Sequence, residues 1–157
     1  MRHAFAVALL IAAGIPADVR AQVDPALVGT WTLGGEAGRG GRGAVPGVPV
    51  ATRLVITVAP GQVRVDSNTG SAESIQTAVY KLDGSETTVP GPLGWTVKAK
   101  AAWKDSALVV STVRSLEGPN GPIGAEIVDV YTVSGATLTI ERTQGRNKQK
   151  LTYKRLS

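Results

Sequence analysis

From residue 30 onward, short segments of alternating apolar and polar residues are separated by turn residues and recur about every 12 residues. The clearest is 95–104, where Val97, Ala99, Ala101 and Trp103 alternate with threonine, lysine and alanine. A period of two predicts a strand with one buried and one solvated face. No segment after the first 21 residues shows convincing helical periodicity. The pattern therefore predicts an all-β chain.

The alternating segments indicate about eight to nine strands, with 87–89 only a short candidate: 30–33, 53–58, 62–65, 74–82, 87–89, 95–104, 107–116, 127–133, 137–143 and 149–156. Short connections favour antiparallel neighbours. A meander of this length leaves two exposed edges unless it closes on itself. We therefore expect an antiparallel up-and-down β-barrel, with a two-sheet β-sandwich as the alternative.

The phase of the alternation also predicts which apolar side chains point inward: Leu54, Ile56, Val58, Val63, Val65, Val97, Ala99, Ala101, Leu108, Val110, Val133, Leu138 and Ile140. Many of these are small or of medium size. Around eight strands is the size at which a barrel is either filled by side chains or holds one small ligand. The sequence leaves a cavity and a filled core as open alternatives.

The first 21 residues have the features of a secretory signal peptide. Met1-Arg2-His3 provides a positive start, 4–15 is an apolar run, and Pro16 interrupts it. Val19-Arg20-Ala21 then has an aliphatic and a small residue at the two positions that a signal peptidase reads. We expect cleavage after Ala21, leaving 22–157 as a single domain in the periplasm or outside the cell. The apolar run is short for a bilayer, which needs about 20 residues. An uncleaved anchor is the alternative.

Composition excludes several classes of site. The chain has no cysteine and its one histidine, His3, lies in the expected signal peptide. Thiol catalysis, thiolate metal sites and histidine-based triads are therefore not expected in the mature domain, and no cofactor or metal is expected. An outer-membrane barrel is also disfavoured, because aromatic residues are only 4% of the chain and cannot form girdles. The glycine-rich stretch 34–43 lacks a phosphate-loop motif, and we expect no nucleic-acid partner.

Gly29-Thr30-Trp31 at the start of the first predicted strand resembles the Gly-x-Trp opening of lipocalins and the wider calycin group. The resemblance implies that Trp31 closes one end of the barrel and packs against an arginine near the end of the last strand. Arg155 is the matching candidate and Arg142 the second choice. The segments 80–84, 103–110 and 131–142 are similar to small secreted bacterial lipocalin-like domains. That likeness implies a lipocalin-like barrel and a carrier of apolar molecules.

Five polar or charged side chains share the predicted inner face: Arg114, Asp129, Tyr131, Arg142 and Tyr153. We expect them to converge near one end of the barrel. A guanidinium group matches a carboxylate or phosphate in a bidentate way, so the arginines are candidate ligand-binding residues. The competing interpretation is a structural ion pair or a wet barrel rim. A register slip of one residue would turn all of them outward.

Three functions remain open. The first is an exported, non-enzymatic module that binds a small, partly apolar molecule, acidic or neutral, inside the barrel. The second is an envelope interaction protein with a filled barrel that uses its basic C-terminal hairpin. Residues 141–157 hold six basic residues and one acidic residue, so weak contact with an anionic membrane surface is also expected. The third is a small barrel enzyme of isomerase or cyclase type, which only fold analogy supports.

Overall fold

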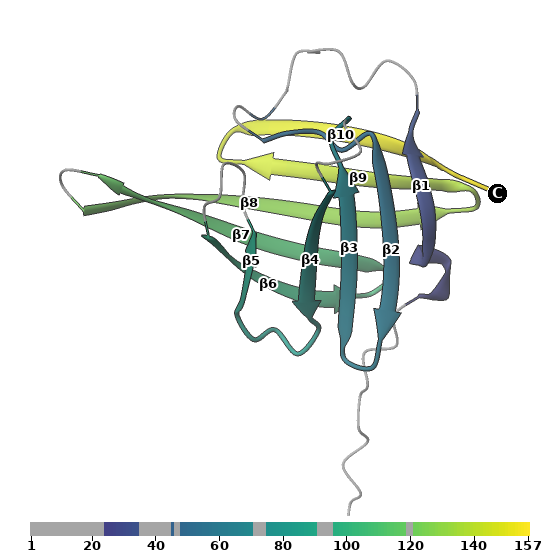
Figure 1. The fold of residues 1–157 in the computed structure, drawn as a ribbon, viewed down its shortest axis with the longest axis horizontal. Coiled ribbons are helices and arrows are strands. Elements are labelled where there is room, and N and C mark those ends of the chain that lie inside the picture. The colour runs from purple at the N-terminus through teal and green to yellow at the C-terminus, as the bar shows by residue number, and fades with distance from the viewer. Residues whose placement is uncertain (1–23, 35–44, 46–47, 71–74, 91–95, 119–120) are drawn as a thin grey trace, which may run out of the picture.

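The computed structural model describes residues 24–34, 45, 48–70, 75–90, 96–118 and 121–157. The expected signal peptide and most of the glycine-rich stretch 34–43 lie outside the described residues. Ten antiparallel strands form one sheet that is wrapped into a nearly closed barrel (Figure 1). The all-β barrel expected from the alternation is confirmed, and the sandwich alternative is wrong. In the described part of the chain, no helix is long and apolar enough to cross a membrane.

A short 3-10 helix, η1 (Pro25–Leu27), precedes the strands. The strands are, in chain order, β1 (Gly29–Leu33), β2 (Arg53–Ala59), β3 (Gln62–Asn68), β4 (Ile75–Lys81), β5 (Thr87–Pro90), β6 (Thr96–Lys104), β7 (Ala107–Gly118), β8 (Gly121–Ser134), β9 (Thr137–Gln144) and β10 (Asn147–Arg155). The count is ten, slightly more than the eight to nine expected, because the short candidate at 87–89 is a strand.

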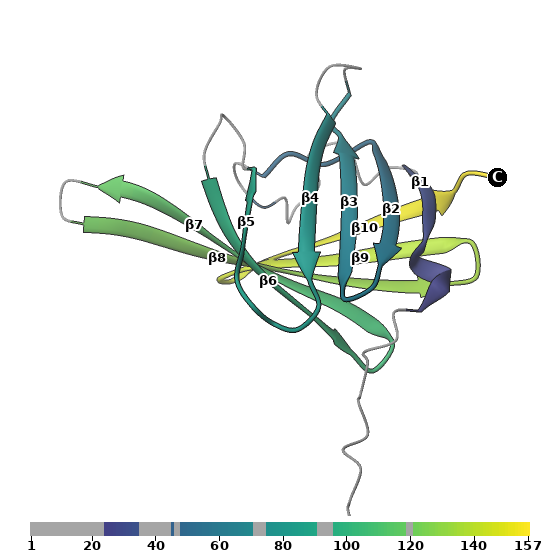
Figure 2. The same ribbon diagram turned by 60° about the horizontal axis from the view of Figure 1, so that its bottom comes forward.

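β7 and β8 are also longer than the alternation indicates. Their ladder continues to the pair Gly118–Gly121, through a glycine- and proline-rich stretch that lies between the predicted strands 107–116 and 127–133. The ladder needs only backbone amides and carbonyls, so it persists where side-chain alternation is lost. The resulting hairpin projects beyond the neighbouring strands (Figure 2).

The order of strands in the sheet is β4-β3-β2-β1-β10-β9-β8-β7-β6-β5. β1 pairs with both β2 and β10, so the first and last strands close the barrel on one side. β4 and β5 are at the two ends of this order, and side chains rather than ladder bonds join them. Ala78 and Tyr80 of β4 pack against Val89, Val97 and Ala99 of β5 and β6. In Figures 1 and 2, β2–β4 cross in front of β6–β10.

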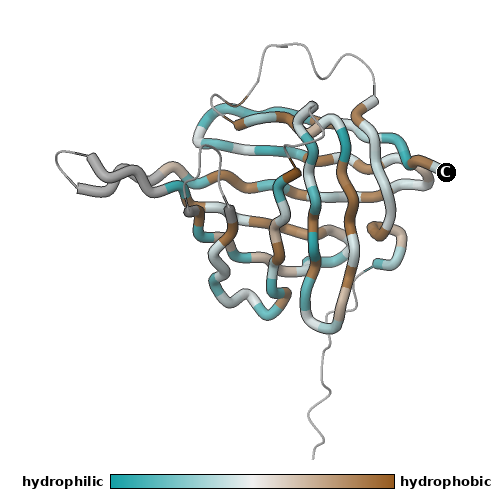
Figure 3. The backbone as a smooth tube through the Cα atoms, in the orientation of Figure 1, coloured by the Kyte–Doolittle hydropathy of each residue, from teal (hydrophilic) through white to brown (hydrophobic). Residues whose placement is uncertain are grey.

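Hydropathy alternates along most strands, as the colours of the tube in Figure 3 show. Of the apolar side chains expected inside, nearly all are buried or packed on the core. Val58 is the exception, at 37% exposed, although Val63 opposite it is fully buried. Val58 lies one residue before the end of β2, at the rim of the barrel, where the alternation continues but the side chain is partly open to solvent.

Candidate functional site

The barrel interior is divided into a filled half and a hollow half. Side chains that are almost completely buried pack around Trp31 and fill that end: Leu27, Ile56, Val63, Leu108, Leu138 and Leu151. Toward the other end lies a cavity of about 140 Å³, with walls from β2–β10 and from the segment that precedes β2. The floor between the two halves consists of side chains that belong both to the core and to the cavity wall, chiefly Leu54, Val65, Tyr131, Ile140 and Tyr153. The two open alternatives, cavity and filled core, therefore each describe one half of the barrel.

An ion pair lies in the wall of the cavity. Asp129 on β8 is directly opposite Arg142 on β9. Arg142 donates two hydrogen bonds, from Nε to Oδ1 at 2.8 Å and from Nη2 to Oδ2 at 2.9 Å. The side chains are only 12% and 13% exposed. Burial by itself would lower the pKa of Arg142, but the hydrogen bonds and the charge of Asp129 outweigh it, and the pKa is raised. Arg142 therefore stays a cation inside the barrel.

This ion pair leaves one strong donor of Arg142 unused. Nη1 is buried and has no hydrogen-bond partner among the described residues. The same holds for Oε1 of Gln149, which is directly opposite Arg142 on β10. Buried polar groups without partners are rare and costly, at about 1–3 kcal/mol each. A polar group of a bound molecule in the cavity would supply the partner that Nη1 lacks.

Arg114 on β7 adds a second cation to the cavity wall. Burial lowers its pKa, the charge of Arg142 lowers it further, and Asp129 opposes both. Among the described residues of the wall, the charged side chains are two arginines and one aspartate. Asp129 is the only carboxylate there, and Arg142 holds both of its oxygens. Among the described residues, the cavity wall thus carries an excess positive charge.

All three tyrosines of the chain, Tyr80, Tyr131 and Tyr153, line the cavity. Burial raises the pKa of Tyr80 and that of Tyr153 to about 12 in each case. Burial raises the pKa of Tyr131 well above its usual value, and the charge of Asp129 adds to the effect. The hydroxyl of Tyr153 donates a hydrogen bond to the carbonyl of Ala51 at 3.0 Å. The three rings therefore remain neutral and provide flat, mainly apolar walls with a polar edge.

The structure brings Arg114, Asp129, Tyr131, Arg142 and Tyr153 to one cavity. Whether they bind a ligand stays a prediction. Tyr80 and Gln149 were not among the predicted site residues. Both lie on inward-facing positions of their strands, so the alternation carried the signal for them. The alternation does not show where β4 and β10 lie relative to β8 and β9, so it could not place these two side chains near Arg142.

Trp31 and Arg155 lie together at the filled end. Arg155 is directly opposite Trp31 on β10, and its Cζ lies 4.2 Å from the centre of the Trp31 ring. The guanidinium donates from Nη1 to the carbonyl of Val28 at 2.8 Å and from Nη2 to that of Ala26. Gly29 has φ +149°, a backbone conformation that other residues rarely adopt, and a Cβ there would lie 2.6 Å from Nη1 of Arg155, so a substitution would be strained and would push the guanidinium from its place. Arg142, the second choice as partner of Trp31, pairs instead with Asp129.

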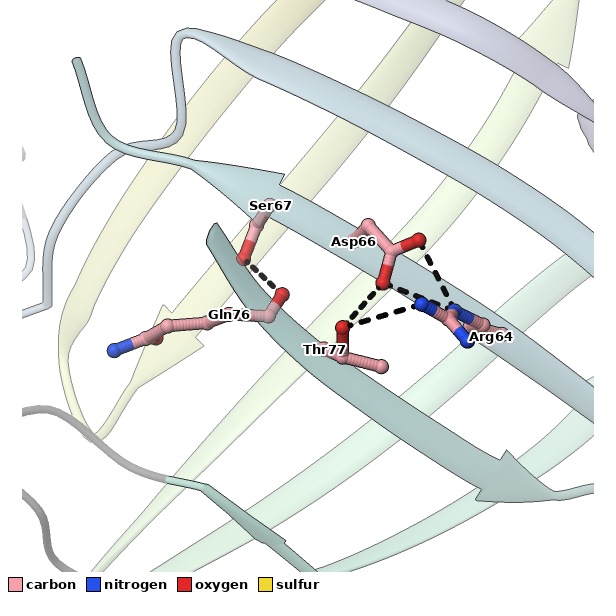
Figure 4. Close-up of polar contacts among 5 residues, drawn as sticks. All are labelled: Arg64, Asp66, Ser67, Gln76 and Thr77. Carbon is pink, nitrogen blue, oxygen red and sulfur yellow. Dashed lines mark hydrogen bonds and ion pairs between the residues drawn. The ribbon is translucent and has the colours of Figure 1, made fainter. Parts of the chain in front are cut away.

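The outer face of β3 and β4 has a separate polar cluster (Figure 4). Nε of Arg64 donates to both oxygens of Asp66 at 3.0 Å, and Thr77 donates to Asp66 as well. Burial would raise the pKa of Asp66, but the hydrogen bonds from Thr77 and Arg64 and the charge of Arg64 lower it overall. Nearer the cavity, Ser67 donates to the carbonyl of Gln76 and ties the two strands together. The Arg64–Asp66 pair therefore stabilises the sheet from outside and is separate from the cavity.

Within the described ranges, no group of three or more histidine, cysteine, aspartate or glutamate side chains is placed to hold a metal ion.

No protein-family model matches the sequence, and no curated protein matches it. Similar solved structures include an apo lipid binding protein 8 from Caenorhabditis elegans, with a TM-score of 0.64 and 11% identity over 85% of this chain and 99% of that one. Fatty-acid-binding protein 1 from Echinococcus granulosus has a TM-score of 0.62 and 16% identity, over 84% and 98%. The REP1-NXSQ fatty acid transporter has a TM-score of 0.62 and 14% identity, over 83% and 96%. At these identities the likeness shows the fold alone: an antiparallel β-barrel similar to those of fatty-acid-binding and lipid-binding proteins.

Proposed function

We propose that this chain binds, without catalysing a reaction, a small and partly apolar molecule that carries one negative charge. The observation that carries the proposal is the buried Nη1 of Arg142, which has no partner in the described chain and belongs to a residue of the cavity wall. A carboxylate could accept a hydrogen bond from it without displacing Asp129, and Arg114 adds attraction. Apolar walls with a few placed polar groups are the usual form of a ligand site. The names of the similar barrels, which include a fatty acid transporter, a fatty-acid-binding protein and a lipid binding protein, agree with this chemistry.

The first test is native mass spectrometry of the protein purified without detergent. A discrete extra mass that is lost on denaturation would identify a bound molecule. The second test is calorimetric titration of benzoate into the wild type, Arg114→Gln and Arg64→Gln. We expect Arg114→Gln to weaken binding, because it removes one of the two positive charges that the described cavity wall offers to the carboxylate. Arg64→Gln is the matched control, since it removes an arginine from the outer face. Equal affinity in all three proteins would contradict the proposal.

We also propose that the protein is exported and acts in the periplasm or outside the cell. The support is the signal-peptide pattern of the first 21 residues. Expression of the full chain in a Gram-negative host, followed by mass measurement of the periplasmic fraction, tests it. The expected result is the mass of a chain that begins at Gln22. A full-length product confined to the cytoplasm would contradict export.

A second candidate function is contact with an anionic surface through the C-terminal hairpin. Arg146, Lys148, Lys150 and Lys154 are all exposed on this hairpin, and Glu141 is its one acidic residue. Such a patch attracts anionic lipid head groups at low ionic strength. Co-sedimentation with vesicles rich in anionic lipid tests the contact, with neutral vesicles as the control. Binding that is absent at low salt would remove this candidate, as would binding that does not depend on lipid charge.

A further inference from the structure

The filled half of the barrel limits how much of any ligand can be buried. Leu108 and Leu138 are completely buried behind the floor and take no part in the cavity wall. The floor itself is held in place, because Tyr153 is fixed by its hydrogen bond to the carbonyl of Ala51. Rotating that ring away would leave a buried hydroxyl and a buried carbonyl without partners. The cavity therefore cannot easily deepen toward Trp31.

The cavity volume sets the size of the part that fits. At about 140 Å³ it is well below the volume of roughly 300–1,000 Å³ that is usual for sites of drug-sized ligands. An apolar cavity of about 150 Å³ holds one benzene-sized molecule. With its charged group at Arg142, a ligand thus has room for about one ring of apolar atoms. The three tyrosine rings in the wall offer flat surfaces to such a ring.

We propose that the cavity selects a compact monocarboxylate of about six to ten non-hydrogen atoms, such as an aromatic acid, over a long-chain fatty acid. This inference rests on the proposed function and concerns the size class of its ligand. Because the floor stops the ligand, the atoms beyond this size stay in water and add nothing to affinity. The structure thus favours a ligand smaller than a long-chain fatty acid, although similar barrels are named as a fatty acid transporter and a fatty-acid-binding protein.

The test is calorimetric titration of a homologous series of straight-chain carboxylates, from butanoate to dodecanoate, together with benzoate. Each methylene that becomes buried should tighten binding about fourfold, which corresponds to about 0.8 kcal/mol per buried CH₂. We expect this gain to stop at about ten non-hydrogen atoms, with benzoate binding at least as tightly as dodecanoate. A gain that continues to dodecanoate would overturn the size limit and leave the proposed function intact. No binding by any member, including benzoate, would overturn both.

Two variants test the cause of the limit. Leu54→Ala shortens a side chain of the floor, so the gain in affinity should continue for about two or three further methylenes. Leu138→Ala is the matched control: it makes the same change in the filled half, away from the cavity wall, and should leave the limit where it is. The wild-type series decides the proposal by itself if either variant fails to fold. If the chain length at which the gain in affinity stops increases equally in both variants, the floor of the cavity does not set the size limit.

Discussion

The Asp129–Arg142 pair offers the sharpest test of the site, through the substitution Asp129→Asn. The change keeps the size of the side chain and removes its charge, so Arg142 becomes a buried cation without a counter-charge. Each of its two hydrogen bonds to a charged group is worth about 1.5–3 kcal/mol, and breaking a buried pair costs about 3–5 kcal/mol. The pair retains 12–13% exposure and borders a cavity, so the low end applies. We expect a loss of about 3 kcal/mol in the free energy of unfolding.

Urea-induced unfolding at neutral pH measures this loss, and Asp66→Asn is the control. Asp66 also accepts two hydrogen bonds from an arginine, but Arg64 is 54% exposed on the outer face. Exposed pairs contribute about 0–1 kcal/mol, so the control should lose no more than that. Equal losses in the two variants would refute the argument that burial makes the inner pair different. A loss below about 1 kcal/mol in Asp129→Asn would refute it as well.

The same variant also tests the role of the site in binding. The amide that replaces the carboxylate has one accepting oxygen in place of two, so one of the donors that Arg142 directs at Asp129 loses its acceptor, and the positive charge of the described cavity wall rises. A carboxylate should then stabilise Asp129→Asn more than it stabilises the wild type. A ligand at 100 times its dissociation constant contributes about 2.7 kcal/mol, which is enough to offset most of the loss. Thermal unfolding with and without benzoate measures the difference. An equal or smaller shift in the variant would argue against carboxylate binding at Arg142.

Three further predictions concern the two ends of the barrel. Trp31→Ala should lower the free energy of unfolding by about 3–5 kcal/mol in a urea titration, because it empties a fully buried site and removes the ring against which Arg155 packs. A loss within about 0.5 kcal/mol would contradict the role of Trp31 in closing this end of the barrel. Since burial raises the pKa of Tyr80 and Tyr153 to about 12, the stability they contribute is complete below about pH 10 and is lost as the pH rises toward 12. All three tyrosines line the cavity, so tyrosinate absorbance should rise only above about pH 10 in the folded protein, and normal titration near pH 10 would disprove burial. Gln149→Leu replaces a buried acceptor, which has no partner among the described residues, by an apolar group. The free energy of unfolding should stay unchanged or rise by up to about 1 kcal/mol. A loss above about 1 kcal/mol would mean that Oε1 has a partner.

Much of the fold could be predicted because alternation is a local property. Period two in 53–58 and 62–65 places Leu54, Ile56 and Val65 inside the barrel, as the structure shows. It failed at Val58, because alternation says which face a residue is on but not where the barrel ends. It also missed the continuation of β7 and β8, since a ladder of backbone groups leaves no mark in the side chains.

The site could be predicted only as a set of residues. The inward phase of β7–β10 was sufficient to select Arg114, Asp129, Arg142 and Tyr153, because each is an even number of residues from a buried apolar neighbour. The alternation did not indicate that Tyr80 lies in the same cavity wall. β4 packs against β5 and β6 because the whole sheet curves, and this curvature cannot be read from one strand.

The sequence by itself determined that this chain is all-β, which face of each strand is inside, and which charged side chains share the interior. Only the tertiary structure decided that Asp129 is opposite Arg142 and that Arg155 lies over Trp31. It also decided that one half of the barrel is filled and the other hollow. The physical reason is the range of the interactions: alternation follows from neighbours two residues apart, whereas strand register and cavity volume depend on contacts between distant segments. The unused donor of Arg142, on which the proposed function rests, belongs to this second kind.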